Sequence, residues 1–579
     1  MLTLHRRSWL ASALGTFATS TFIAASALLA SAPASAQTAQ TSAADEDPHA
    51  ACTTVTWVPP EILSRPVPLR EGVGNAQDAV TTKSDEARAF YIQGLNYLHG
   101  YVWIEAMRSF HQALRHDPDF AMAYWGMSRM QSGLDDHDSA VRSARRAEEL
   151  AKQATPREQR RIALRLLQLD AIASIADQAK FQAYKQAIDK ALVADTDDIE
   201  LWLIRGNAEE PTAAGRGQRG GVGSTAFYQE ALRRSPDNAA AHHYLIHSYE
   251  TINRIDAALV HGEKYAGLSP AIPHAHHMWA HDLRRVGRID DAIAAFKRTD
   301  DLENAYYAAE GISPEMDWHH VHNLDLLATS YQHKGKMKQA EALLRKAESL
   351  PSVTNYLEFN QKALTMFLFG RERWKDALIA ADKLTRGKYP PTRVVGYALA
   401  GHVHLERGKR DAAAVALASA ERELAEVPEV TAGIAVNRNA VRPYVDMLRG
   451  DMLLRDGETE KGRELLETVQ LQLRALPGPD AWTQALFRLE AIARIAREVG
   501  DWELAGFTAK QMMEHDPAFG GSQLARALVA QHRGDASEMK SALTSARQYW
   551  KDADANIREL AVLRKMESSG RVASARVAR

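Results

Sequence analysis

The sequence predicts an all-α solenoid, an array of stacked pairs of antiparallel helices. From Asp85 onward, apolar residues recur at helical spacing almost without a break. Two histidine pairs recur with the same spacing, His243 with His247 and His277 with His281. Each histidine of the second pair follows its counterpart by 34 residues, which is the period of a two-helix repeat. Such a repeat buries its apolar face only against its neighbours, so we expect one continuous array without separate globular domains.

The first 36 residues are typical of an export signal that is removed from the mature chain. Arg6 and Arg7 give a basic start, residues 10–30 are small and apolar, and Ala34-Ser35-Ala36 fits the cleavage rule. The mature protein would begin near Gln37, in the periplasm or outside the cell. The two arginines followed by Ser-Trp-Leu resemble a twin-arginine signal with Trp in place of the usual Phe, and both export routes stay open.

Composition excludes several partners. Lys plus Arg total 71 and Asp plus Glu total 73, which gives no reason to expect nucleic acid or an anionic membrane surface. Beyond the N-terminal segment, no apolar run is long enough to span a bilayer. Cys52 is the only cysteine, so no intrachain disulfide can form and packing alone must hold the exported chain together. The role of Cys52 stays open.

Four segments follow from these patterns. Residues 1–36 form the signal, and residues 37–84 are partly disordered or extended, since they begin polar and then carry Pro59, Pro60, Pro66 and Pro68. Residues 85–568 form a solenoid of about ten repeats, several of them degenerate, and end in a capping helix. The Arg/Ser/Ala-rich tail, 569–579, is expected to be loose.

The first repeat carries the clearest motif. In a 34-residue frame, positions 4, 8, 11, 20, 24, 27 and 32 are occupied by Phe90, Gly94, Tyr97, Ala106, Phe110, Ala113 and Pro118. This pattern resembles the tetratricopeptide repeat, in which small residues let two antiparallel helices approach closely and the proline ends the second helix. The resemblance spans most of the chain. It is specific for fold and weak for function, because one scaffold serves many roles.

The resemblance also implies which side chains face the concave groove, namely positions 2, 5, 9 and 12 of each first helix. One repeat then presents His243, His247 and Glu250, and the next presents His274, His277, His281 and Arg284. After an insertion of about 14 residues within 300–316, the following helix presents His322 and Asp325. Just before these two come Trp318, His319 and His320.

Histidines four residues apart share one helix face, and neighbouring helices pack about 8–10 Å apart. The two pairs can therefore converge on one ion. Imidazole with carboxylate suits zinc, iron or copper better than magnesium or calcium. The expected ligands are His243, His247, His277, His281, His322 and Asp325. Glu250 could be a ligand, an orienting group or a general base, and it is our candidate catalytic residue.

A second set of residues is expected to line the groove around the metal ligands: His274, Arg284, His319, His320 and Trp318. Tyr306, Tyr307 and Trp318 lie in or beside the insertion and could form a lid, with Glu310 and Glu315 near its mouth. Three functional hypotheses stay open: a transition-metal site, a metal-free scaffold that holds a peptide or partner protein, and a metal-dependent hydrolase or oxidase acting on a small molecule. The alternative without any such function is that the histidines only form a polar, hydrogen-bonding surface of the groove.

Overall fold

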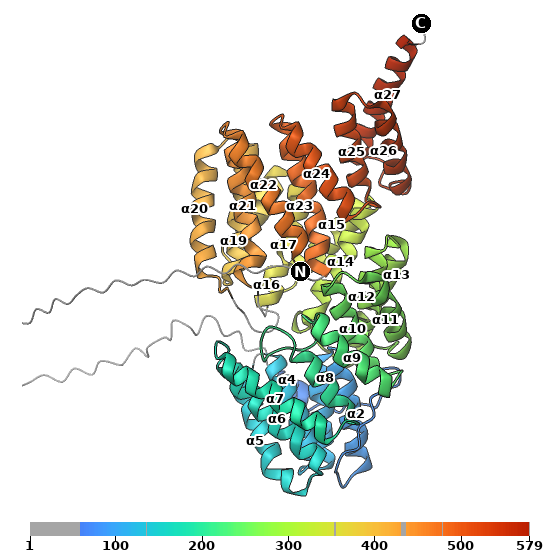
Figure 1. The fold of residues 1–579 in the computed structure, drawn as a ribbon, viewed down its shortest axis with the longest axis vertical. Helices are drawn as coiled ribbons and strands as arrows, with labels where there is room; N and C mark the ends of the chain where they lie inside the picture. The colour runs from blue at the N-terminus through green and yellow to red at the C-terminus, as the bar shows by residue number, and fades with distance from the viewer. Residues whose placement is uncertain (1–57, 135, 353–354, 430–435, 477–478, 578–579) are drawn as a thin grey trace, which may run out of the picture. The chain divides into compact units, whose positions relative to one another are not determined.

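The computed structural model describes residues 58–577, apart from 135, 353–354, 430–435 and 477–478. The expected signal, its twin-arginine motif and Cys52 lie outside the described residues. Across the described part of the chain every regular element is a helix, which confirms the predicted all-α, tetratricopeptide-type solenoid (Figure 1). None of the helices described is long and apolar enough to cross a lipid bilayer.

Consecutive helices pair into antiparallel hairpins that follow one another along the array. The first part contains α1 (Pro60–Leu63), α2 (Asp85–His99), α3 (Trp103–His116), α4 (Ala121–Gly133), α5 (His137–Leu150), α6 (Pro156–Ala173), α7 (Gln178–Ala194), α8 (Ile199–Asn207) and α9 (Val222–Arg234). The central part contains α10 (Ala239–Thr251), α11 (Ile255–Leu268), α12 (Pro273–Arg285), α13 (Ile289–Glu310), α14 (Trp318–His333) and α15 (Met337–Ser349).

The remaining helices are α16 (Asn355–Asn360), α17 (Lys362–Gly370), α18 (Trp374–Leu384), α19 (Pro390–Glu406), α20 (Arg410–Glu426), α21 (Arg438–Arg455), α22 (Thr459–Ala475), α23 (Pro479–Glu498), α24 (Trp502–His515), α25 (Gly520–Arg533), α26 (Ala536–Tyr549) and α27 (Arg558–Val577). Short 3₁₀ turns occupy Ala151–Gln153 and Pro314–Met316. Helix α27 continues into the tail that composition predicted to be loose. The expected insertion within 300–316 is mostly helical, because α13 simply runs on to Glu310.

Packing between α2 and α3 explains the motif of the first repeat. Ala106, Phe110 and Ala113 are fully buried. A methyl group on Gly94 would lie 2.7 Å from the Phe110 ring, so the two helices can approach this closely only with glycine at that position.

Turns between helices in this array usually contain a glycine with a positive φ, a left-handed backbone conformation that is strained for residues with a Cβ atom. Such glycines are Gly287, Gly335, Gly408, Gly457, Gly500 and Gly534. Three equivalent turns carry other residues at a φ between 57° and 58°, namely Tyr101, Asn253 and Glu372. A tyrosine at such a position is strained, which suggests that its ring is needed there.

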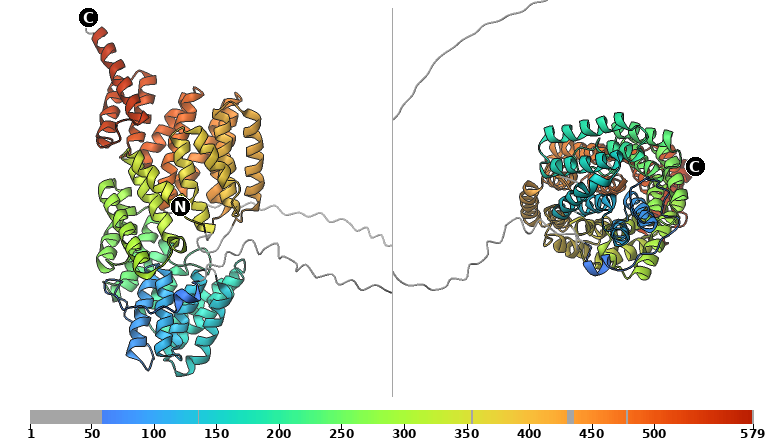
Figure 2. Two further views of the ribbon diagram at one scale, coloured as in Figure 1. Left: turned by 180° about the vertical axis from the view of Figure 1, so that it is seen from behind. Right: turned by 90° about the horizontal axis from the view of Figure 1, so that it is seen from below.

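The segment before α2 links the start of the array to its centre. The Arg65 side chain donates to the carbonyl oxygen of Glu310 at 2.8 Å, across 245 residues. The backbone nitrogen of Ala271 donates to the carbonyl oxygen of Gly72 at 2.9 Å. The view from below in Figure 2 shows the blue N-terminal helices beside the green helices of the central part. Early and central repeats thus contact each other directly.

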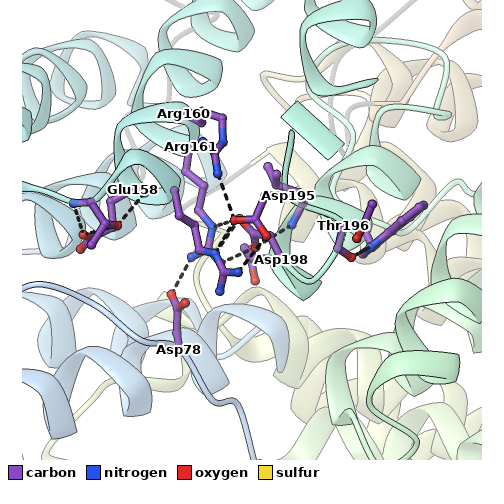
Figure 3. Close-up of polar contacts among 12 residues, drawn as sticks. Asp78, Glu158, Arg160, Arg161, Asp195, Thr196 and Asp198 are labelled. Carbon is purple, nitrogen blue, oxygen red and sulfur yellow. Dashed lines mark hydrogen bonds and ion pairs between the residues drawn. The ribbon is translucent and has the colours of Figure 1, made fainter. Parts of the chain in front are cut away.

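Figure 3 shows how the same segment is held at α6. Arg161 is buried and forms ion pairs with Asp78 at 2.6 Å and with Asp198, which precedes α8, at 2.5 Å. Nearby, the Thr81 backbone nitrogen donates to Glu158 at 2.7 Å. Because both aspartates are themselves almost fully buried, Arg161 is the cation that makes their burial tolerable.

Replacing this arginine should therefore be costly. We expect Arg161→Met to lower the free energy of unfolding by about 3–5 kcal/mol, because it removes the buried cation that pairs with both carboxylates. The matched control is Arg145→Met, which breaks an exposed ion pair with Glu148 and should cost no more than about 0.5 kcal/mol. Urea denaturation followed by circular dichroism measures both. Equal effects of the two substitutions would contradict this account of the segment.

Candidate metal centre

Helices α10 and α12 place four histidines on one shared surface, as the 34-residue offset predicted. The side chain of Asn238 caps α10 by accepting from the backbone nitrogen of Ala241 at 2.8 Å, and Pro273 begins α12. Helix α14, which follows the extended α13, brings further histidines to the same place. All the cluster histidines are at most 8% exposed: His243, His247, His274, His277, His281, His319 and His322. The concave groove predicted from the repeat frame is therefore covered at this point.

The first group of three, hereafter triplet 1, consists of His243, His247 and His274. The Nε2 atom of His243 lies 3.1 Å from Nε2 of His247 and 3.0 Å from Nε2 of His274. The other ring nitrogen of His243 donates to the backbone carbonyl of His99 at 2.6 Å. Tyr265 stacks on His243 with ring centroids 4.8 Å apart. His274, which we predicted as a groove residue, is thus part of a possible ligand set.

The second group, triplet 2, consists of His277, His281 and His322, and each offers one ring nitrogen within 4.8 Å of the others. His277 donates from Nδ1 to the side-chain oxygen of Asn323 at 2.9 Å. The Asn323 amide nitrogen in turn donates to the carbonyl of Phe296 at 3.1 Å, which fixes the orientation of the amide. Among the described residues, Nε2 of His277 and both ring nitrogens of His281 have no hydrogen-bond partner.

His319 lies between the two triplets, and Glu303 of α13 holds it in place. The ring of His319 lies 4.9 Å from that of His274 and 4.4 Å from that of His277, centroid to centroid. Its Nδ1 donates to one oxygen of Glu303, whose other oxygen accepts from Nδ1 of His320 at 2.9 Å. Burial opposes ionisation of Glu303, but the two histidines outweigh it and lower its pKa to about 2. His320 points toward this carboxylate, and it forms with Glu303 and Asp300 a third, more acidic group.

The imidazoles are held in the neutral form that binds metal. Burial lowers the pKa of His243, His274, His277 and His281 well below the usual value, and neighbouring imidazoles lower it further. A metal ligand has to present an unprotonated ring nitrogen, so this electrostatic environment favours coordination over protonation.

Glu250 lies close to both triplets, as predicted. Its carboxylate is 3.9 Å from His247 Nδ1 and 3.5 Å from His281 Nδ1. Neither oxygen accepts a hydrogen bond from any residue described in the structure. Burial raises the pKa of Glu250 to about 7, although His247 partly opposes the shift. Glu250 is placed to orient these two rings.

Two predicted site residues are placed elsewhere. Asp325 interacts with Lys362 and Gln484 and belongs to neither triplet. Arg284 is buried with its guanidinium 5.4 Å above the Trp482 ring. Trp318, in contrast, lies beside the cluster as expected: its ring is 5.2 Å from His319 and 6.1 Å from His322, and it also stacks on Trp103 at 5.2 Å. Asp325 and Arg284 fall at positions 5 and 12 of their repeats as expected, but later helices fill the space in front of them.

Hydrogen bonds and ion pairs hold the expected lid region against the rest of the protein. Tyr306 donates to Glu105 at 3.0 Å and Tyr307 to Asp317 at 2.8 Å. Glu310 forms ion pairs with Arg70 and Arg108. These contacts tie α13 to the first repeat and to the N-terminal segment.

Sequence reasoning missed the residues that the first repeat contributes. The Tyr101 ring lies 4.5 Å from His243, 5.0 Å from His274 and 6.0 Å from His247, and so covers triplet 1. Its hydroxyl donates to the carbonyl of Arg216 at 2.7 Å. The available signal was a tyrosine at a turn where most other repeats have glycine.

We expect Tyr101→Gly to destabilise the fold by about 2–4 kcal/mol, since loss of a buried aromatic ring outweighs roughly 1 kcal/mol of relieved backbone strain. Asn253→Gly is the matched control, because Asn253 has the same backbone conformation but an exposed side chain. It should change stability by no more than about 0.5 kcal/mol. Thermal and urea unfolding measure both, and a stabilised Tyr101→Gly protein would show that the ring has no packing role.

No known protein-family pattern matches the chain, and no curated protein sequence matches it either. Solved structures with related helical arrangements are repeat proteins. The human IFIT1 dimer with PPP-AAAA is 11% identical, with a TM-score of 0.38 over 74% of this chain and 90% of that chain. Yeast Tom70 is 13% identical, with a TM-score of 0.31 over 85% of this chain and 97% of that chain. Likeness at this level carries no argument about ligand or activity.

Proposed function

We propose that this protein is an exported helical-repeat protein whose buried histidine cluster binds a transition-metal ion. The observation that carries the proposal is triplet 2. Among the described residues, Nε2 of His277 and both ring nitrogens of His281 have no hydrogen-bond partner, and His277, His281 and His322 each offer one ring nitrogen within 4.8 Å of the others. Buried polar atoms without partners typically cost about 1–3 kcal/mol each, so a convergent set of them calls for a ligand.

The donor set defines which ions fit. Three imidazoles suit zinc, copper or iron, whereas magnesium and calcium prefer oxygen. The hydrogen bond to Asn323 fixes the His277 tautomer and leaves its Nε2 lone pair available for a metal. Glu250 lies 3.5 Å from Nδ1 of His281 without a hydrogen bond, so it can orient that ring by electrostatic attraction. Three protein ligands also leave a further coordination position for water or a small molecule.

The competing hypothesis is a metal-free scaffold that holds a peptide or partner protein. The residues expected to contact such a partner include His274, Arg284, His319 and His320, and all four are at most 4% exposed. A peptide could reach them only after the first repeat, α13 and, for Arg284, α23 had moved away. Burial therefore favours an ion over a peptide at this place in the fold.

Elemental analysis tests the proposal. Protein purified through its native export route should retain near-stoichiometric zinc, copper or iron after extensive dialysis. The double variant His277→Ala/His281→Ala should lose at least one ion per chain, while His276→Ala should lose none, because the half-buried His276 is hydrogen-bonded to the carbonyl of Pro270 instead. Circular dichroism checks that helicity is kept. Metal-free wild-type protein would favour the scaffold hypothesis.

Export is tested separately. If residues 1–36 are a signal, the mature chain recovered from a bacterial periplasm should begin near Gln37, as determined by N-terminal sequencing and intact mass. Substituting Arg6 and Arg7 by lysine should reduce export strongly if the twin-arginine route is used and little if the general route is used. Recovery of the full-length chain from the cytoplasm would contradict the expected localisation.

A further inference from the structure

We propose that the cluster is a two-metal centre, with a second transition-metal ion held by His243, His247 and His274. This inference deepens the proposed function and relies on it for the first ion at triplet 2. Its own observation is that two other ring nitrogens lie within 3.1 Å of Nε2 of His243. The two triplets share no residue.

His243 imposes the first constraint. Its Nδ1 faces a backbone carbonyl oxygen, which can only accept, so the ring proton must be on Nδ1. The Nε2 atom of the neutral ring then has a single lone pair. Two other ring nitrogens lie within hydrogen-bond distance of that atom, those of His247 at 3.1 Å and His274 at 3.0 Å. One lone pair cannot accept two good hydrogen bonds, so at least one of these contacts is unsatisfied in the absence of a ligand.

The other end of the cluster imposes a second constraint. Nδ1 of His319 faces the carboxylate of Glu303, which can only accept, so a proton is on Nδ1, and a ring with that single proton presents a lone pair at Nε2. Nδ1 of His274 lies 3.0 Å from Nε2 of His319 and donates to it when His319 has that single proton. The neutral His274 ring then also has a lone pair at Nε2, which points at the lone pair of His243 from 3.0 Å.

A cation at this point satisfies every constraint at once. With neutral rings, the Nε2 atoms of His243, His247 and His274 all present lone pairs to the cation. At the same time His274 still donates from Nδ1 to His319, and His319 still donates from Nδ1 to Glu303. Ligands 2.0–2.1 Å from a tetrahedral ion stand about 3.3 Å apart, close to the spacings of 3.0 and 3.1 Å found here. An added proton could satisfy only one of the two contacts of His243.

The surroundings complete the site. Tyr101 covers the three rings on one side, and Tyr265 stacks on His243. The two triplets are adjacent, since the rings of His274 and His277 are stacked with centroids 5.7 Å apart. His319 contacts both of these rings and would orient a ligand of triplet 1 under the control of Glu303.

Metal stoichiometry tests the two-ion arrangement. Full-length protein is stripped with a chelator, titrated with Zn²⁺ in a calorimeter, dialysed and measured by mass spectrometry of the elements. The wild type should bind two ions per chain. His274→Ala should keep one, His281→Ala should keep one, and the combined variant none. His242→Ala is the matched control and should keep two, because its ring is bonded to His261 and to the carbonyl of Pro236.

Each failure has its own meaning. One ion per wild-type chain overturns the two-ion proposal and leaves the proposed function intact, and no bound ion overturns both. If His274→Ala loses its helical signal, His247→Ala removes a ligand of the same triplet from its most exposed position and is measured in its place. Two ions retained in a folded His274→Ala/His247→Ala double variant would also overturn the assignment of the second site.

Discussion

The hydrogen bond from His243 to the carbonyl oxygen of His99 is the interaction on which the rest of this region depends. It joins α10 to the end of α2 across 144 residues, and it fixes the proton of one ring nitrogen so that the other faces its neighbours with a lone pair. His99 itself is held by Tyr244 at 2.8 Å and by Glu200 at 3.0 Å. One contact therefore both closes the array on itself and sets the chemistry of the first histidine triplet.

The sequence predicted the fold well, because helical hairpins depend on local residues. Glycine or alanine at close-approach positions, such as Gly94, and apolar residues at 34-residue spacing are visible without a structure. The histidines of α10 and α12 could also be placed together, since they occupy equivalent positions in adjacent repeats. Asp325 was misplaced because frame position alone does not reveal which later helix covers a side chain.

Three contributors could not be predicted from repeat frames at all. Tyr101 and His99 come from a repeat more than 140 residues earlier, and Glu303 lies in the part of α13 that exceeds the normal repeat length. Their approach depends on how the array curves, which is set by many small rotations between hairpins rather than by any one motif. The same curvature brings Tyr101 of the first repeat over His243 and His274, which were expected to line the groove.

The segment before α2 has a consequence for how this protein unfolds. Solenoids usually gain stability from nearest neighbours, so that terminal repeats can fray one at a time. Here Arg65 reaches Glu310 and Asp78 reaches Arg161, which ties the N-terminal segment to repeats far along the chain. Residues from 58 to about 333 should consequently melt as one cooperative block, and the histidine centre cannot assemble until α14 has left the ribosome.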